Sequence, residues 1–245
     1  MTTPDNSNTS VSSHDTTAQE NITTFWSTVA PFYESDPDNV PSPESSEHQR
    51  WTRTIEQLLP RPPADVLDLG TGTGFVAMIA SRLGHRATGV DLSAAMLSEA
   101  RAHADRSGLA TRFEIGDAVN PPFEQSSFDA IVCRHLLWTL RQPKVAISNW
   151  LRLLRPDGRI IVIDAFWFAQ PLPEDDFGLF QRHYNTQTRD ALPAMRWDRI
   201  ELVTDLLTSI GLSDVTVIDL AEVGLLAAQQ ANPHQWFIVT GRQGR

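Results

Sequence analysis

A glycine-rich loop constrains this chain more than any other feature of its sequence. Residues 65–69 (DVLDL) form a short apolar run that indicates a buried strand, and glycines follow at positions 70, 72 and 74. Glycine lets the backbone turn sharply and approach a ligand closely, and the helix expected over 75–83 offers unpaired N–H groups at its start. The pattern therefore predicts a strand, a ligand-binding turn and a helix in succession.

The spacing of these glycines excludes two common nucleotide loops. The dinucleotide fingerprint G-x-G-x-x-G needs a glycine where this chain has Phe75, and the P-loop needs a Gly-Lys-Ser/Thr sequence that does not follow here. The loop instead reads D-x-G-x-G-x-G from Asp68 to Gly74. A ligand without a pyrophosphate is therefore favoured.

Short apolar runs and helical segments alternate from residue 65 onward. We expect strands over 65–69, 87–90, 112–115, 128–133, 159–164, 214–220 and 236–240, and helices over 75–83, 93–105, 144–154 and 200–210. Such alternation predicts an α/β fold with a doubly wound, mostly parallel sheet. Ligands of these sheets bind at the carboxyl ends of the strands.

Several further motifs stand in the order that one known family shows. Asp91 ends the second expected strand, Asp117 follows the third, FDAIV occupies 128–132 and LRPDG occupies 154–158. Together with the loop, this set resembles the class I S-adenosylmethionine (SAM)-dependent methyltransferases over about residues 64–165. The resemblance implies a Rossmann-like fold with a seven-stranded sheet, SAM as the methyl donor, S-adenosylhomocysteine as the product and a small-molecule acceptor.

The resemblance also implies which residues contact the donor. Asp91 would accept hydrogen bonds from the ribose hydroxyls and Asp117 would meet the adenine amine, although an isolated acid at such a place is often only a helix cap or a solvated strand end. The segment APFYE at 30–34 resembles a lid sequence of small-molecule methyltransferases. The implied cofactor-binding residues are Tyr33, Asp68, Gly70, Thr71, Gly72, Gly74, Asp91, Leu92, Met96, Asp117, Ala118 and Arg134.

Three residues are candidates for acting on the acceptor. His135 follows the fourth strand, where donor and acceptor meet in the family, and a neutral imidazole there can accept a proton. His183 and Tyr184 are weaker candidates, for which ordinary packing is the favoured role. Metal-dependent O-methyltransferases place an aspartate where this chain has Arg134, so no catalytic metal is expected.

The string NPPF at 120–123 resembles a motif of amino-methylating DNA and protein methyltransferases. In those families it lies at the carboxyl end of strand four, whereas here it precedes that strand. We therefore interpret it as a turn.

The chain divides into three expected parts. Residues 1–20 are almost all polar, which predicts a disordered tail. Residues 21–60 are expected to form a helical lid, to which Trp51 also belongs. Residues 61–245 are expected to form the SAM-binding domain. An insertion at 165–197, after strand five, is predicted to cover an apolar or aromatic acceptor. Its aromatic residues are Phe166, Trp167, Phe168, Phe177, Phe180, Tyr184 and Trp197.

The formal net charge of −10 is unevenly distributed. Eight of the 30 acidic residues and none of the 20 basic residues precede Arg50, so the rest of the chain, with 22 acidic and 20 basic residues, is nearly neutral. Such a chain is not expected to bind nucleic acid by neutralising phosphates. The single cysteine excludes an internal disulfide, and without an apolar run of membrane length or a visible signal peptide we expect no membrane contact and a cytoplasmic protein.

Two other functions remain open at this point. The first alternative to a small-molecule methyltransferase is an RNA or protein methyltransferase, which a basic face formed by Arg141, Lys144, Arg152, Arg155 and Arg159 would favour. The second is a protein that binds SAM without turnover. The oligomeric state cannot be read from the sequence.

Overall fold

A computed structural model describes residues 13–36, 39–168, 178–220, 225 and 235–244. Its centre is a seven-stranded sheet in the order β3-β2-β1-β4-β5-β7-β6, in which only the pairs of β7 with β5 and β6 are antiparallel. The strands are β1 (Asp65–Leu69), β2 (Arg86–Asp91), β3 (Arg112–Ile115), β4 (Phe128–Arg134), β5 (Leu154–Ala165), β6 (Leu212–Ile218) and β7 (Trp236–Gln243). The predicted doubly wound, mostly parallel α/β sheet is confirmed.

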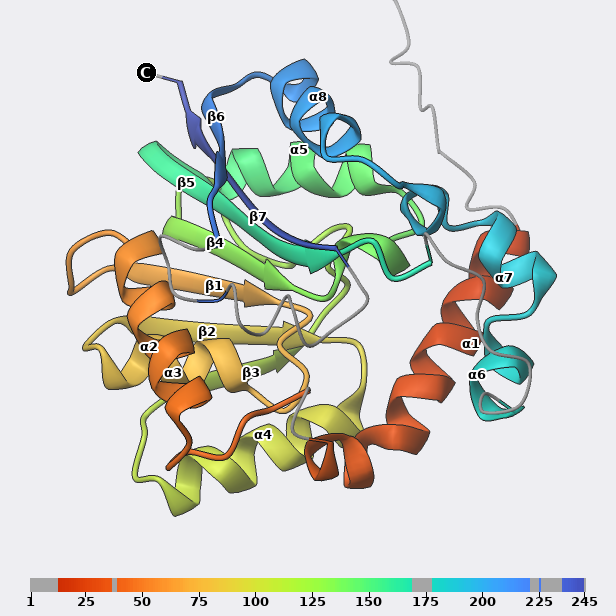
Figure 1. The fold of residues 1–245 in the computed structure, drawn as a ribbon, viewed down its shortest axis with the longest axis horizontal. Helices are drawn as coiled ribbons and strands as arrows, with labels where there is room; N and C mark the ends of the chain where they lie inside the picture. The colour runs from red at the N-terminus through yellow and green to blue at the C-terminus, as the bar shows by residue number, and fades with distance from the viewer. Residues whose placement is uncertain (1–12, 37–38, 169–177, 221–224, 226–234, 245) are drawn as a thin grey trace, which may run out of the picture.

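Helices cover both faces of this sheet and one of its ends. They are α1 (Ser13–Val29), α2 (Ser46–Leu58), α3 (Phe75–Arg82), α4 (Ala94–Arg106), α5 (Pro143–Leu153), α6 (Gly178–His183), α7 (Thr186–Asp190) and α8 (Glu201–Ile210), with 3-10 turns η1 (Ala30–Ser35), η2 (Leu137–Thr139) and η3 (Pro193–Arg196). In Figure 1, α1, α6 and α7 stand at the end toward which the arrows of β1 and β4 point. That end is the edge where ligands of such sheets bind.

Alternating side chains of the strands form two separate cores. Within residues 130–133 of β4, the first and third contact the cluster that contains Ile55 of α2 and Ile79 of α3. The second and fourth contact the cluster that contains Ile147 of α5 and Leu207 of α8. Because both faces are covered, the central strands are apolar throughout, as their sequences indicate.

The sequence predicts most element boundaries within a few residues, but two expectations are wrong. The expected disordered tail extended to residue 20, but residues 13–20 are helical and belong to α1. Ala18 of this helix is buried, and Asn21 Nδ2 donates to Thr188 Oγ1 over 3.0 Å. Tertiary contacts therefore hold this polar helix in place. Residues 1–12 lie outside the described part. Strand β5 begins at Leu154, whereas the expected strand covered 159–164. The LRPDG segment at 154–158 is therefore an irregularity inside the strand, where the β4–β5 register shifts.

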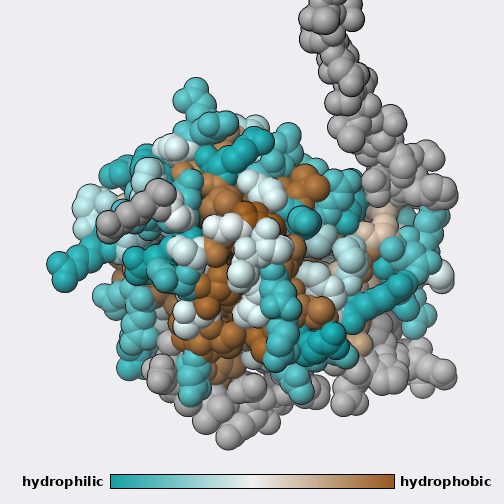
Figure 2. Space-filling model, turned by 90° about the horizontal axis from the view of Figure 1, so that it is seen from above, coloured by the Kyte–Doolittle hydropathy of each residue, from teal (hydrophilic) through white to brown (hydrophobic). Residues whose placement is uncertain are grey.

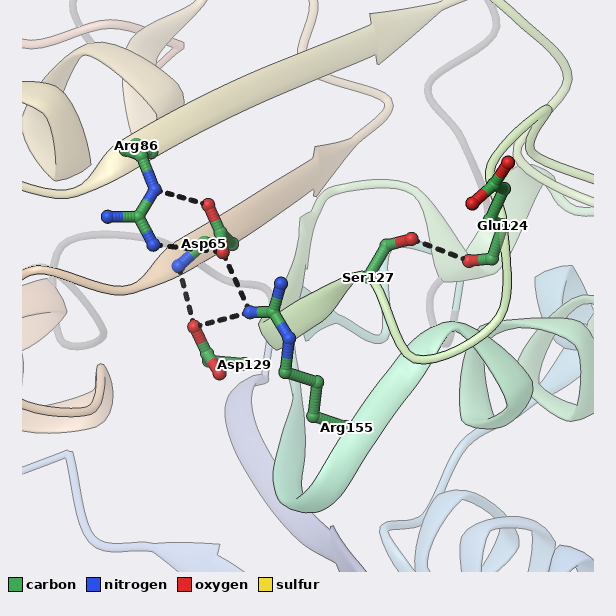
Figure 3. A network of polar contacts seen from close by, with 6 residues as sticks. All are labelled: Asp65, Arg86, Glu124, Ser127, Asp129 and Arg155. Carbon is green, nitrogen blue, oxygen red and sulfur yellow. Dashed lines mark hydrogen bonds and ion pairs between the residues drawn. The ribbon is translucent and has the colours of Figure 1, made fainter.

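Charged residues gather at the opposite end of the sheet, where the strands begin. Arg155 Nη1 lies 2.7 Å from Asp65 Oδ2 and 2.9 Å from Asp129 Oδ2, and Arg86 Nε lies 2.6 Å from Asp65 Oδ1 (Figure 3). Asp129 Oδ2 also accepts the backbone N–H of Asp65 over 2.7 Å. This network ties the starts of β1, β2, β4 and β5 together, away from the ligand-binding edge.

Hydrophobic residues are also visible on the surface. Figure 2, seen from the side of α8 and β6, shows a band of them between hydrophilic residues. The large apolar side chains that are exposed in the described part are Phe32, Ile115, Val145 and Val217.

Helix α5 offers a matched test of the core. Ile147 is fully buried and Val145 is 47% exposed on the same helix. We expect Ile147→Ala to lower the free energy of unfolding by about 2–5 kcal/mol because it removes packed methyl groups and leaves a cavity. Val145→Ala is expected to change it by about 0.5 kcal/mol or less. Urea denaturation followed by circular dichroism measures both; equal losses would contradict the assignment of this face.

Candidate functional site

The loop after β1 is held in left-handed backbone conformations that suit glycine. Gly70 has φ of +66°, and a Cβ atom there would lie 2.8 Å from Leu136 Cδ1. Gly74 has φ of +91°, and its added Cβ would lie 2.9 Å from Phe113 Cζ. Gly72 also has a positive φ, but no atom lies within 4 Å of its added Cβ. The loop is therefore packed at both ends and open in the middle, toward a cavity.

The side chain of Asp68 holds the loop through two hydrogen bonds. Its Oδ2 accepts hydrogen bonds from Thr71 Oγ1 over 2.7 Å and from the Ala77 backbone N–H over 3.1 Å. Burial raises the pKa of Asp68 to about 7, although these two donors lower it. Asp68, Thr71 and Gly74 do not line the cavity, so they shape the loop from outside it.

Asp91 connects the loop to the next helix. Its Oδ2 accepts from the Gly72 N–H over 3.0 Å, and its Oδ1 accepts from the Ser93 N–H over 2.8 Å. Burial raises the pKa of Asp91, and the backbone donors oppose that shift. Each carboxylate oxygen keeps a second lone pair, so Asp91 can still accept two hydrogen bonds from a vicinal diol.

Asp117 is held in place by Arg141, which the sequence suggested for a basic outer face. Its Oδ2 lies 3.1 Å from Arg141 Nη2, and its Oδ1 accepts from the Val119 N–H over 2.8 Å. Arg141 is one of the five basic residues that could form an outer face, but its side chain is only 9% exposed. Arg155, from the same group, lies in the ion-pair network at the other end of the sheet. The five basic residues therefore do not form one face.

These elements enclose the donor cavity, our name for the cavity at the carboxyl ends of β1, β2 and β4. Predicted residues that line it come from both the loop and the strand ends: Tyr33, Gly70, Gly72, Asp91, Leu92, Met96, Asp117, Ala118, Arg134 and His135. Helix α1 covers the cavity with side chains that sequence reasoning missed: Gln19, Ile22, Thr23 and Trp26. The only sequence signal for them is the spacing of Ile22 and Trp26, which places both on one helix face.

A second cavity adjoins the first and is lined almost entirely by aromatic and apolar side chains. It has a volume of about 450 Å³, within the range of small-molecule sites. Its lining residues are Phe25, Trp26, Val29, Phe32, Tyr33, Asn39, His135, Trp138, Trp167, Phe168 and Phe180. We call it the aromatic cavity. Trp26, Tyr33 and His135 line both cavities, so they stand at the junction.

The aromatic residues of the predicted insertion have different places. Trp167, Phe168 and Phe180 line the aromatic cavity, whereas Phe166 and Trp197 pack in the core beneath α5 and α8. Phe177 lies outside the described residues. The insertion therefore supplies one wall of the aromatic cavity, and part of it completes the core.

His135 occupies a strained position at the junction. It has φ of +57°, which is rare for a residue with a side chain and is typical of functional sites. Its ring lies edge-on to Trp236 at 4.8 Å between centroids and is tilted against Trp167 at 4.9 Å, while its Nε2 is buried without a partner. Burial, with a smaller effect of the neighbouring Arg134, lowers the pKa of His135 well below its usual value. The imidazole is therefore neutral at physiological pH.

His183 and Tyr184 do not reach either cavity. Tyr184 is fully buried; its hydroxyl accepts from Trp26 Nε1 over 3.0 Å and lies 2.8 Å from Thr139 Oγ1. The Tyr184 ring stacks on Phe180 at 4.4 Å between centroids. Tyr184 therefore connects helix α1 of the lid to the aromatic wall by packing and hydrogen bonding. The ring of His183 lies at the edge of this cluster, 6.3 Å from that of Phe25 between centroids.

Asp164, near the end of β5, is a buried acid beside the site that sequence reasoning missed. Its oxygens accept from the Leu137 N–H over 2.8 Å, the Ala165 N–H over 2.9 Å and Trp167 Nε1 over 2.7 Å. Burial raises the pKa of Asp164 to about 6. It positions both the turn after His135 and one wall of the aromatic cavity.

The described part of the chain holds no group of three or more His, Cys, Asp or Glu side chains arranged to bind a metal ion. None of its helices combines the length and the apolar character needed to cross a membrane.

The NPPF string lies in the loop between β3 and β4, where the Asn120 N–H donates to Asp117 O over 3.0 Å.

Comparison with known proteins shows which family this chain is similar to. Residues 67–162, which span β1 to β5 and most of the donor cavity, match the family model described as a methyltransferase domain. The match covers less than half of the chain, and over that part the chain is similar to this methyltransferase family. Among curated methyltransferases, it is 33% identical over 138 residues to the demethylmenaquinone methyltransferase of Thermus thermophilus, covering 55% of this chain and 61% of that protein. It is 32% identical over 153 residues to the ubiquinone/menaquinone biosynthesis C-methyltransferase UbiE of a Ruegeria species, covering 60% and 58%. Both matches thus span less than two thirds of the relative.

Solved structures of this methyltransferase fold cover more of the chain. Phosphoethanolamine N-methyltransferase 2 of Haemonchus contortus, in complex with SAM, has a TM-score of 0.66 at 20% identity and covers 96% of this chain and 61% of its own. The [4+2]-cyclase SpnF has a TM-score of 0.66 at 18% identity and covers 93% and 97%. Since one neighbour is named for methyl transfer and the other for cyclisation, the fold alone does not specify the reaction.

The state of His135 can be tested directly. We expect its imidazole to remain neutral as the pH falls through 6.5, and to become protonated only at clearly lower pH, because burial disfavours the charged form. Arg134→Met should move this titration upward, since it removes a nearby positive charge. NMR titration of labelled histidine side chains measures both; titration of His135 near 6.5 in the unchanged protein would contradict the desolvated geometry.

Proposed function

We propose that this protein transfers a methyl group from SAM to a small apolar or aromatic acceptor. The observation that carries the proposal is the pair of adjoining cavities, one with acids at strand ends and one with aromatic walls, which share Trp26, Tyr33 and His135. A methyl group has to pass directly between two molecules bound side by side. Two chemically different cavities with a common wall suit that transfer.

The donor cavity matches the chemistry of SAM. Asp91 offers acceptors for the two ribose hydroxyls, and Asp117 offers one for the adenine amine. Leu92 and Met96 supply apolar surface for the purine ring between these acids. One solved structure with the same fold is a complex with SAM, which supports SAM as the ligand of this cavity.

The aromatic cavity supports a ring-containing or otherwise apolar acceptor. Flat aromatic walls bury such a ligand and favour offset or edge-to-face contacts with it. The curated relatives are named for menaquinone and ubiquinone biosynthesis, which supports an acceptor of this general kind. The cytoplasmic location expected from the sequence stays a prediction.

Positioning and exclusion of water supply much of the rate in an in-line methyl transfer. Helix α1 closes the donor cavity, and the aromatic walls keep water from the acceptor. His135 is the one neutral base that lines both cavities in the described structure, so we assign it the proton that the acceptor loses.

Binding of the donor is tested by Asp91→Ala. We expect the affinity for SAM, measured by calorimetry, to fall about 10- to 100-fold, because two hydrogen bonds to a charged acceptor are lost. Asp105→Ala, which removes an exposed acid from α4, is the matched control and should bind as the unchanged protein does. Unchanged SAM affinity in Asp91→Ala would overturn the ribose assignment.

Methyl transfer is tested with labelled SAM and a fractionated metabolite extract, with mass spectrometry of the product. We expect label in a small apolar product, and about a 100-fold loss of turnover in His135→Ala with little change in SAM affinity. Tight SAM binding without any transfer of label would favour a different reaction in the aromatic cavity, as the neighbour named a [4+2]-cyclase illustrates, or a protein that binds SAM without turnover. Label in RNA or protein fractions alone would contradict a small-molecule acceptor.

A further inference from the structure

A third cavity lies between the lid and the carboxyl ends of α3 and α4. It has a volume of about 290 Å³, close to that of the smallest small-molecule sites. None of the residues that line it also lines the donor cavity or the aromatic cavity. We call it the outer cavity, and the function proposed above makes no use of it.

Two arginines from different helices line the outer cavity. Arg82 lies in the last turn of α3 and Arg106 in the last turn of α4, and no carboxylate of the described residues lies within ion-pair distance of either. Cations at such places ordinarily stabilise the helix dipole. Arg82, however, reaches other elements: its Nη2 donates to Ser107 Oγ over 3.3 Å, and its Nη1 lies 3.4 Å from His48 Nε2. Because Ser107 directly follows Arg106, both arginines belong to one cationic wall.

The rest of the lining is largely apolar. Val40 and Pro41 contribute from the lid, and Phe75 and Met78 contribute from α3. A small hydrated ion would gain nothing from such surface, whereas a ligand with an apolar body would bury it there. Two guanidinium groups favour a doubly charged phosphate as the polar end of that ligand.

The outer cavity also contains the contact that ties the lid to α4. Glu34 Oε1 lies 2.8 Å from His103 Nδ1, and both residues line the cavity. His103 precedes Arg106 by three positions, so the two side chains are neighbours on the surface of α4. Glu34 directly follows Tyr33, which lines both the donor and the aromatic cavity. A negative charge bound at Arg106 therefore repels the carboxylate that holds this part of the lid.

We propose that the outer cavity binds a small organic phosphate as an effector. Its phosphate contacts Arg82 and Arg106, and its apolar body lies against Phe75 and Met78. The bound phosphate weakens the contact of Glu34 with His103, loosens the lid and lowers the affinity for the methyl donor. The coupling rests on the proposed donor site, whereas the binding of the phosphate does not.

Binding is tested by calorimetry with butyl phosphate and inorganic phosphate. We expect butyl phosphate to bind about 10-fold more tightly than inorganic phosphate, because its alkyl chain is buried against the apolar lining. Arg82→Met and Arg106→Met should each weaken the binding of butyl phosphate about 10-fold or more. Arg53→Met is the matched control; it removes an exposed arginine of α2 that does not line the cavity, so it should bind as the unchanged protein does.

The coupling is measured as the affinity for S-adenosylhomocysteine with and without saturating butyl phosphate. We expect about a 5-fold loss of affinity in the unchanged protein, which sodium chloride at the same ionic strength should not reproduce. Glu34→Gln should bind butyl phosphate more tightly and yet lose the coupling, because a neutral amide is not repelled. Hydrogen exchange adds a readout of the lid, in which butyl phosphate should speed exchange of the amides of residues 29–36.

Each contrary result has a distinct meaning. Undetectable binding of butyl phosphate, or equal binding by the unchanged protein and a folded variant that carries both Arg82→Met and Arg106→Met, would overturn the site. Equal affinity for butyl phosphate and inorganic phosphate would contradict an organic ligand and favour free phosphate. Binding that leaves the affinity for S-adenosylhomocysteine unchanged would overturn the coupling through Glu34. Failure of the unchanged protein to bind S-adenosylhomocysteine would overturn the proposed function, while the titration with butyl phosphate would still decide the outer cavity.

Discussion

The arrangement of the site depends on the hydrogen bonds that hold the turn after β1. Asp68 accepts hydrogen bonds from Thr71 and Ala77, and Asp91 accepts one from Gly72. A segment with three glycines can adopt many backbone conformations, and ordering it costs conformational entropy. These hydrogen bonds select the left-handed conformations that the glycines adopt here. The same bonds join the ends of β1 and β2 to the starts of α3 and α4. Both the opening toward the donor cavity and the position of Asp91 follow from them.

The lid is the second structural requirement, and it depends on aromatic contacts more than on its own helix propensity. Helix α1 is polar over much of its length, yet Phe25 and Trp26 reach across to the cluster of Phe180 and Tyr184. Short isolated helices are marginal in water, so this packing is what holds α1 in place. Because the cluster also forms walls of the aromatic cavity, binding of an acceptor and order in the lid are physically linked.

Three buried charged residues lie toward the carboxyl ends of neighbouring strands: Asp68 in β1, Arg134 in β4 and Asp164 in β5. They are not paired with one another in ion pairs. Backbone N–H groups satisfy the two acids, whereas aromatic rings surround the cation. The acids and the cation are therefore stabilised by different kinds of partner, with no ion pair between them.

The sequence alone determined the order of strands and helices, the loop and the two acids at strand ends. These features are local, because a five-residue apolar strand or a glycine turn depends on neighbours along the chain. Tertiary structure decided the rest. Residues 13–20 have a disordered composition and became helical through contacts with α7, Arg141 turned inward to Asp117, and the aromatic insertion divided between the core and a cavity wall. Each of these outcomes depends on partners distant in sequence, so the local pattern could not reveal them.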